Sequence, residues 1–89
     1  MLSKKKCIKV SFEGETKRLK PAATFNQLCQ DVRQKFFLPK WMPRFYYLDD
    51  ENELISITQQ SDYEEALEVL ENIPSLKLII AATAQDARL

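Results

Sequence analysis

The sequence contains no histidine, only two cysteines and a single glycine. The missing histidine removes the side chain that most often acts as general base, proton shuttle or metal ligand. Two cysteines cannot by themselves supply the four ligands of a structural zinc site. These absences argue against an enzyme, a metal centre, a bound cofactor and a small-molecule substrate.

Long apolar runs are also missing. No stretch approaches the roughly 20 apolar residues that cross a bilayer, and residues 1–6 lack the apolar core of a signal peptide. Cys7 and Cys29 are typical of buried, reduced thiols in a chain without an export signal. We therefore expect a cytoplasmic protein with no membrane partner.

The composition is that of an ordinary globular domain, with 45% hydrophobic and 29% charged residues. A chain of 89 residues can bury one thin core. We expect residues 1–89 to form a single domain with its core at about 6–81. Residues 83–89 show no pattern, which predicts a flexible tail.

A net charge of zero, from 13 basic and 13 acidic side chains, hides a strong segregation. Residues 1–44 hold eleven basic and three acidic residues, a net charge of +8 (eleven minus three). Residues 45–89 hold two basic and ten acidic residues, a net charge of −8 (two minus ten). Charge asymmetry between the halves of a chain indicates an interaction function.

Two periodicities divide the chain into seven predicted elements. Alternation of apolar and polar residues, as at Ile8, Val10 and Phe12, is typical of a half-buried strand. Apolar residues at spacings of three and four are typical of a helix that packs on a core. The sequence therefore predicts strands at 7–12, 16–20, 45–48, 54–57 and 76–80 and helices that begin at Thr24 and Ser61.

Local signals mark the ends of these elements. We expect positive φ angles at Gly14 and Asn52, in the turns between paired strands. Thr24 with Gln27, and Ser61 three residues before a glutamate, fit capping boxes. The helix residues expected to face inward are Phe25, Leu28, Cys29, Val32 and Phe36, followed by Ala66, Leu67, Leu70 and Ile73.

The order of these elements is strand, strand, helix, strand, strand, helix, strand. Pro39 and Pro43 bracket a loop that contains Trp41, and Pro74 ends the second helix. Hairpins combined with helices on one sheet face predict an α+β fold. The order and size suit a ubiquitin-like β-grasp with a mixed sheet and two helices.

The acidic turn after the third predicted strand first raises the possibility of a calcium site. An EF-hand loop that starts at Asp49 needs glycine at its sixth position and glutamate at its twelfth. Those positions hold Leu54 and Gln60, so we reject an EF-hand. Asp49, Glu51 and Glu53 alternate along the turn, where like charges repel.

Two further acids, Asp62 and Glu65, lie three residues apart at the start of the second predicted helix, so they are neighbours on its surface. Asp62 also complements the positive end of that helix. No such structural role is evident for the acids of the preceding turn. We therefore interpret the five carboxylates as a docking surface for cations.

A complementary basic surface is expected on the first predicted hairpin. Lys9 points away from the core in the alternation of the first strand, and Lys17 and Arg18 lie on the second. A basic patch can also bind nucleic acid, but zero net charge and a large acidic half argue against that partner.

On these residues the chain resembles the Phox-and-Bem (PB-one) interaction domain over about residues 6–81. The resemblance rests on the segments 8–12, 17–19, 47–53 and 62–67. The last two are similar to the OPCA motif of that family, which reads Asp-x-Asp-Gly-Asp followed by an acidic helix start. This sequence departs from the motif with glutamate at two acidic positions and with asparagine in place of glycine.

The resemblance implies a ubiquitin-like fold that pairs into heterodimers or head-to-tail chains. It places Lys9 on the first-strand lysine of the family and the next two basic residues on its accessory pair. The sequence is most similar to the autophagy-receptor branch of the family, and kinase scaffolds are also similar. The partner-binding residues that the resemblance implies are Lys9, Lys17 and Arg18 on the basic face and Asp49, Glu51, Glu53, Asp62 and Glu65 on the acidic face.

The sequence thus predicts a non-catalytic interaction module, in a scaffold, signalling or selective-autophagy protein. Its expected partners are other domains of this family, or itself head to tail. Three alternatives stay open: a conjugated ubiquitin-like modifier, which the missing Gly-Gly tail disfavours; an enzyme or metal protein; and a lipid- or nucleic-acid-binding domain that uses the basic half.

Overall fold

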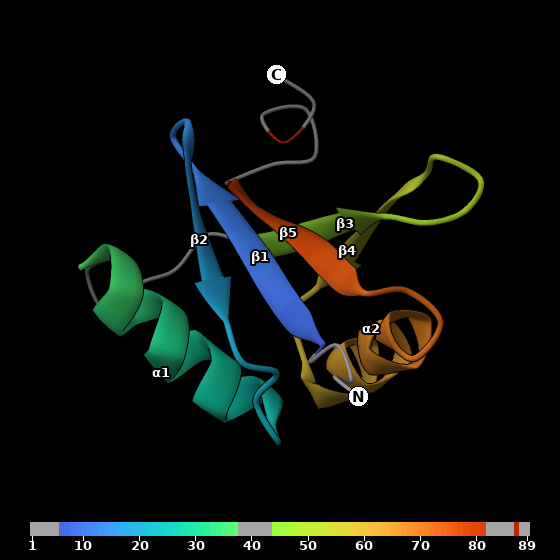
Figure 1. Cartoon of the computed structure of the whole chain (residues 1–89), viewed down its shortest axis with the longest axis horizontal. Helices are drawn as coiled ribbons and strands as arrows, with labels where there is room; N and C mark the ends of the chain where they lie inside the picture. The colour runs from blue at the N-terminus through green and yellow to red at the C-terminus, as the bar shows by residue number, and fades with distance from the viewer. Residues whose placement is uncertain (1–5, 38–43, 82–86, 88–89) are drawn as a thin grey trace, which may run out of the picture.

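Seven elements follow one another in the predicted order in the computed structural model, which describes residues 6–37, 44–81 and 87. The predicted bounds of the first and fourth strands are confirmed, and the others differ by only a few residues. The predicted Trp41 loop and most of the predicted tail lie outside the described residues. The elements are β1 (Cys7–Phe12), β2 (Glu15–Leu19), α1 (Phe25–Phe36), β3 (Arg44–Leu48), β4 (Leu54–Ile57), α2 (Gln60–Leu70) and β5 (Ser75–Ala81) (Figure 1).

The strands form one mixed sheet in the order β2-β1-β5-β3-β4. β1 pairs antiparallel with β2 and parallel with β5, and β3 pairs antiparallel with both β5 and β4. One face of this sheet and both helices contribute to a single core cluster, so both helices pack on the same face. This arrangement confirms the predicted α+β β-grasp fold.

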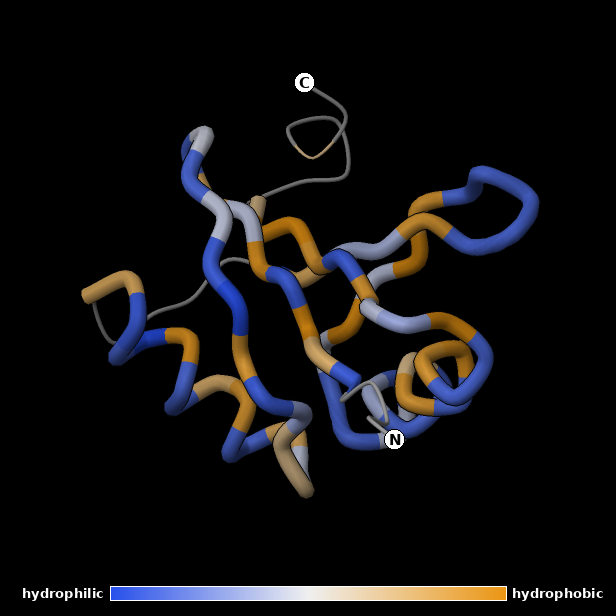
Figure 2. The backbone as a smooth tube through the Cα atoms, in the orientation of Figure 1, coloured by the Kyte–Doolittle hydropathy of each residue, from blue (hydrophilic) through white to orange (hydrophobic). Residues whose placement is uncertain are grey.

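Burial follows the strand alternation. Ile8 and Val10 of β1 and Leu76 and Leu78 of β5 are buried, while Lys77 between the last two is exposed. Figure 2 shows hydrophobic residues recurring along the strands and helices, and a hydrophilic loop between β3 and β4. The core therefore lies between the helices and one sheet face, and the charged residues lie outside it.

The β1–β2 hairpin closes through a two-residue turn. Both turn residues have positive φ angles, 50° at Glu13 and 83° at Gly14, as the right-handed twist of paired strands favours. The expectation for Gly14 is confirmed, and Glu13 adopts the same unusual region.

The predicted capping box at the start of α1 is only half formed. Thr24 Oγ1 accepts a hydrogen bond from the Gln27 N–H at 3.1 Å, as predicted. The Gln27 side chain does not reach back, because it donates to Asp31 Oδ1 at 2.9 Å. The first amide of the helix, on Phe25, instead donates to Gln60 Oε1 of α2 at 2.8 Å. A side chain of the second helix therefore helps to cap the first.

The prediction that Ser61 caps α2 is wrong. The helix begins at Gln60, its N-cap is Gln59, and no side chain of the N-cap forms the usual hydrogen bond. Asp62 Oδ2 accepts the Thr58 N–H at 3.0 Å and lies 3.3 Å from Thr58 Oγ1. The carboxylate of the first turn thus secures the preceding chain, which lets the helix start before Ser61.

Tyr63 is a core residue that the sequence interpretation missed, although its spacing to Ala66, Leu67 and Leu70 is that of one apolar helix face. Its side chain is fully buried on α2, and its hydroxyl donates to the Ala22 carbonyl at 2.6 Å. Tyr63 therefore fixes the segment between β2 and α1 against the second helix. No helix in residues 6–37 and 44–81 is long and apolar enough to cross a bilayer.

Candidate protein-interaction surfaces

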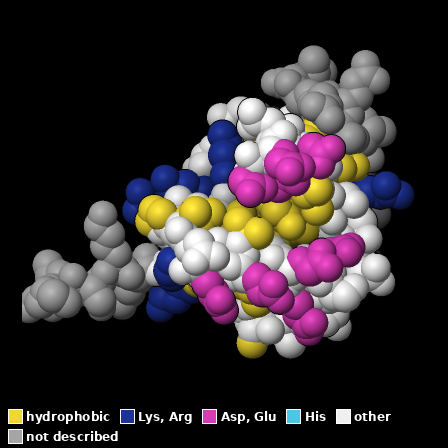
Figure 3. Space-filling model, turned by 90° about the vertical axis from the view of Figure 1, so that its right-hand side faces the viewer, with side chains coloured by type: hydrophobic (Ala, Val, Ile, Leu, Met, Phe, Trp, Pro, Cys, Tyr) yellow, Lys and Arg dark blue, Asp and Glu magenta, His cyan; other side chains and the backbone are white. Residues whose placement is uncertain are grey.

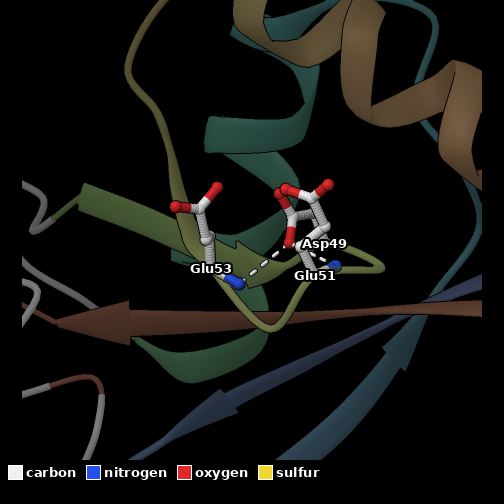
Figure 4. Close-up of side chains that lie close together, drawn as sticks. All are labelled: Asp49, Glu51 and Glu53. Carbon is white, nitrogen blue, oxygen red and sulfur yellow. Dashed lines mark hydrogen bonds between the residues drawn. The ribbon is translucent and has the colours of Figure 1, made fainter.

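The acidic loop between β3 and β4 is built around Asp49. Its Oδ1 atom accepts the N–H groups of Glu51, at 2.9 Å, and Glu53, at 2.8 Å (Figure 4). The backbone closes the same turn, because the Asp49 N–H donates to the Glu53 carbonyl and the Asn52 N–H donates to the Asp49 carbonyl, each at 3.0 Å. Asn52 has a φ angle of 63°, which confirms the expected left-handed residue.

This geometry gathers three carboxylates in one place. Oxygen atoms of Asp49, Glu51 and Glu53 all lie within 4.8 Å of one another. Asp49 is half-buried, whereas the two glutamates are exposed. Two like charges at such a distance repel by about 1 kcal/mol even in water. The loop therefore concentrates negative charge at a cost that a docked cation would offset.

Asp49 also has a structural role that the sequence interpretation missed. Two hydrogen bonds from backbone amides to one carboxylate oxygen hold the loop closed. The interpretation that no structural role applies to Asp49 is therefore wrong. Among the described residues, the side chains of Glu51 and Glu53 form no such bond.

Tyr47 links the acidic loop to the acids of α2. Its side chain is buried in the sheet. Burial raises the pKa of the Tyr47 phenol, and the negative charges of Glu65, Asp49 and Asp62 raise it further. The phenol therefore lies in the field of carboxylates from both the β3–β4 loop and α2.

Figure 3 shows this face of the molecule. Acidic side chains gather in two groups, with hydrophobic side chains between them. We call the predicted acidic residues, which come from the β3–β4 loop and from α2, the acidic surface: Asp49, Glu51, Glu53, Asp62 and Glu65.

The strands that carry the predicted basic residues, β1 and β2, lie away from the β3–β4 hairpin in the sheet (Figure 1). Lys9 of β1 is opposite Arg18 of β2 in the antiparallel register. Both alternate with core residues, so they share the sheet face that carries no helix.

The same register adds a residue that the sequence interpretation missed. Lys9 is also opposite Lys77 of β5, in the parallel pairing of the two strands. The signal for its orientation was present, because Lys77 lies between the buried residues Leu76 and Leu78. Its place beside Lys9 depends on the β1–β5 pairing, which the residue pattern alone did not specify.

Lys17 does not belong to this face. It is opposite the buried Val10, and its Nζ atom lies 5.7 Å from the centre of the Phe36 ring on α1. Successive residues of a strand point to opposite faces, so Lys17 and Arg18 cannot share one patch. The expectation of a single patch with Lys9, Lys17 and Arg18 is corrected to Lys9 and Arg18, which we call the basic surface.

Lys6 illustrates a basic residue with a structural role. Its Nζ atom donates to the carbonyls of Glu71, at 2.9 Å, and Ile73, at 2.7 Å, just after the C-terminal end of α2. A cation at this end of a helix is favourable, because the free carbonyls carry partial negative charge. Lys6 therefore anchors the chain before β1 rather than forming part of the basic surface.

Solved structures with a similar fold include PB1 domains. The AtNBR1-PB1 domain matches with a TM-score of 0.71 and 16% identity, over 91% of this chain and all of that one. The PB1 domain of Cdc24p in its long form matches with a TM-score of 0.72 and 15% identity, over 88% of this chain and 97% of that one. The chain from the AtNBR1-PB1 L-type filament matches with a TM-score of 0.66 and 18% identity, over 86% and 96%.

Curated relatives in plants are more similar in sequence. Protein NLP2 of Oryza sativa subsp. japonica is 31% identical over 70 residues, which are 76% of this chain and 8% of that protein. Protein NLP8 of Arabidopsis thaliana is 35% identical over 65 residues, which are 71% of this chain and 7% of that protein. The chain therefore spans less than a tenth of these relatives. The expected autophagy-receptor branch stays a prediction, since AtNBR1 shares only the fold.

The family itself follows from the sequence. The model of the PB1 (Phox-and-Bem) domain matches residues 6–83, which include every strand and helix described above. The chain belongs to the PB1 domain family, whose members are protein–protein interaction modules that pair with one another.

Proposed function

We propose that this domain pairs front to back with PB1 domains, including further copies of itself. The basic surface of one molecule docks on the acidic surface of the next. The single observation that carries this proposal is the separation of the two surfaces. Lys9 and Arg18 lie on β1 and β2, at one side of the sheet, and the acidic surface lies on the β3–β4 loop and α2, at the other.

Because of this separation, the basic surface and the acidic surface of one molecule cannot pair with each other. A contact between two different surfaces leaves one free surface on each end, so it propagates unless a ring closes. The fold of the AtNBR1 domain, which assembles into a filament, is similar and fits such a mode of assembly. A heterotypic partner with only one of the two surfaces would end the chain.

We also propose a class of partner and a cellular compartment for this domain. Two opposite charged surfaces favour another protein over nucleic acid or a membrane, whose phosphates would oppose the acidic surface. Cys7 and Cys29 are both free thiols, which supports a reducing compartment such as the cytoplasm. We propose that the parent protein uses the module as a scaffold in signalling or in selective autophagy.

The test is a concentration series by analytical ultracentrifugation at low and high salt. We expect the weight-average mass to rise with concentration at low salt. Added salt should reverse this rise, because it screens exposed charges beyond a Debye length of about 8 Å at physiological ionic strength. A domain that stays monomeric at millimolar concentration in low salt would contradict self-pairing.

A further inference from the structure

We propose that the docking face for a partner's acidic loop spans three strands, with Lys77 as its third cation. We call Arg18, Lys9 and Lys77 together the basic row, and its occupant is the Asp49, Glu51 and Glu53 loop of a second PB1 domain. This inference rests on the front-to-back pairing proposed above and names the side chains that meet.

The sheet register places the three cations in line. Lys9 is opposite Arg18 on one side and opposite Lys77 on the other, and β2, β1 and β5 are consecutive in the sheet. Neighbouring strands lie about 4.8 Å apart, so this register puts the three Cα atoms in a row that runs across the strands. Figure 1 shows β2, β1 and β5 side by side. All three side chains leave the sheet on the face opposite the helices.

The acidic loop matches this row in number and scale. It presents three carboxylates whose oxygen atoms lie within 4.8 Å of one another. In Figure 4 the three carboxylate groups point to the same side of the loop. Asp49 is held by the amides of Glu51 and Glu53, so the cluster is ordered before a partner arrives. A partner that presents three cations at strand spacing can therefore meet three carboxylates at once.

The basic row is also costly in an isolated molecule. Like charges directly opposite each other on paired strands are destabilising, and Lys9 has one on each side. The side-chain hydrogen bonds found within residues 6–37 and 44–81 include none from Arg18, Lys9 or Lys77. The donors of Lys6, by contrast, are used by backbone carbonyls. The row thus keeps its charges available for a partner.

The test uses two variants that can form one intact contact with each other. A Glu51→Ala, Glu53→Ala protein keeps the whole basic row and a weakened acidic surface, and a Lys9→Ala protein keeps the whole acidic surface and a weakened basic row. Calorimetric titration of one with the other gives the affinity of a single contact. Lys77→Gln and Lys77→Glu are then added to the first protein. The matched control is Lys35→Glu, which makes the same charge change at an exposed position on α1.

We expect Lys77→Glu to weaken binding about tenfold or more, and Lys77→Gln by a few-fold, because each removes one member of a docked charge pair. Lys35→Glu should weaken it by no more than about twofold, since it changes only the long-range field. The effect of Lys77→Gln should shrink when the acidic partner carries Glu53→Gln. Circular dichroism checks that every variant is folded. If the charge reversal Lys77→Glu perturbs β5, the comparison uses the affinity of the Lys77→Gln variant instead.

Two results would overturn the inference in different ways. If the two parent variants do not bind each other, front-to-back pairing between copies of this domain is wrong. If they bind, but Lys77→Glu and Lys35→Glu weaken binding equally, pairing stands and the basic row does not extend to β5.

Discussion

Asp49 accepts the backbone N–H of Glu53 at 2.8 Å, so the residue that begins the acidic loop also closes it. A second amide, from Glu51, bonds the same carboxylate oxygen at 2.9 Å. Asp49 therefore contributes both charge and loop stability, whereas the side chains of the two glutamates contribute charge alone. This difference divides the acidic surface into parts that mutation can separate.

The first prediction follows from this division. Asp49→Ala should lower the free energy of unfolding by about 1–2 kcal/mol, because two loop amides lose their acceptor. Asp49→Asn keeps an acceptor oxygen and should lose much less. Glu51→Ala with Glu53→Ala should stay within about 0.5 kcal/mol of the wild type, since both side chains are exposed. Urea unfolding measures all three, and equal losses would show that the loop is held by its backbone alone.

The second prediction concerns the two surfaces together. Lys9→Ala should remove the basic surface, and Glu51→Ala with Glu53→Ala should weaken the acidic one. Each change is expected to cost about 2–5 kcal/mol of pairing free energy, so each protein alone should be monomeric. Mixed, they should form a one-to-one dimer and stop, because no complementary ends remain. Analytical ultracentrifugation measures the mass of the species in the mixture. Persistent monomers would mean that the two surfaces do not bind each other.

A third prediction concerns Phe37, the residue that ends α1. It has a left-handed φ angle of 57°, and its side chain is 90% exposed. A side chain in this region costs about 1 kcal/mol, and glycine avoids that cost. Phe37→Gly should therefore raise the free energy of unfolding by up to about 1 kcal/mol.

Phe37→Ala is the control for this change, because it removes the ring and keeps the backbone strain. It should leave the stability close to that of the wild type. Thermal unfolding compares the variants. A glycine variant that is less stable than the alanine variant would show that the left-handed geometry is not the dominant cost at this position.

The fourth prediction concerns high pH. The pKa of Tyr47 is raised by burial and by the charges of Glu65, Asp49 and Asp62. The pKa of Tyr63 is also raised, mainly by burial. An unfolded tyrosine loses its proton near pH 10, whereas these two hold theirs to higher pH when folded. The stability that they contribute is complete below about pH 10 and is lost as the pH rises through their folded pKa values.

Titration of phenolate absorbance measures this effect. Glu65→Gln removes one negative neighbour and should lower the pKa of Tyr47 while leaving that of Tyr63 unchanged. The absorbance change that is missing in Tyr47→Phe identifies the titration of the Tyr47 phenol. A Tyr47 titration that does not respond to Glu65→Gln would show that loop and helix do not share one acidic surface.

Much of this fold is predicted by local pattern. Alternation around Ile8 and Val10 identified the first strand, and helical spacing identified the buried Leu28 and Val32. The acidic turn and its left-handed Asn52 are also local, because a turn is determined by a few consecutive residues. The true face of Lys17 was also predictable from the sequence, because the alternation of strand residues alone separates it from Arg18.

Tertiary structure decided the features that join distant segments. The Tyr63 hydroxyl donates to the Ala22 carbonyl, and Gln60 Oε1 accepts the Phe25 N–H at the start of α1. The periodicity of the sequence does not predict either of these long-range hydrogen bonds. The side-by-side placement of Lys9 and Lys77 likewise depends on which strands pair and in which register. A strand pattern specifies the face on which a side chain lies, but the neighbour across the sheet is chosen by the packing of the whole core. The sequence by itself therefore determined the charges and their faces, and only the folded sheet decided which of them lie together.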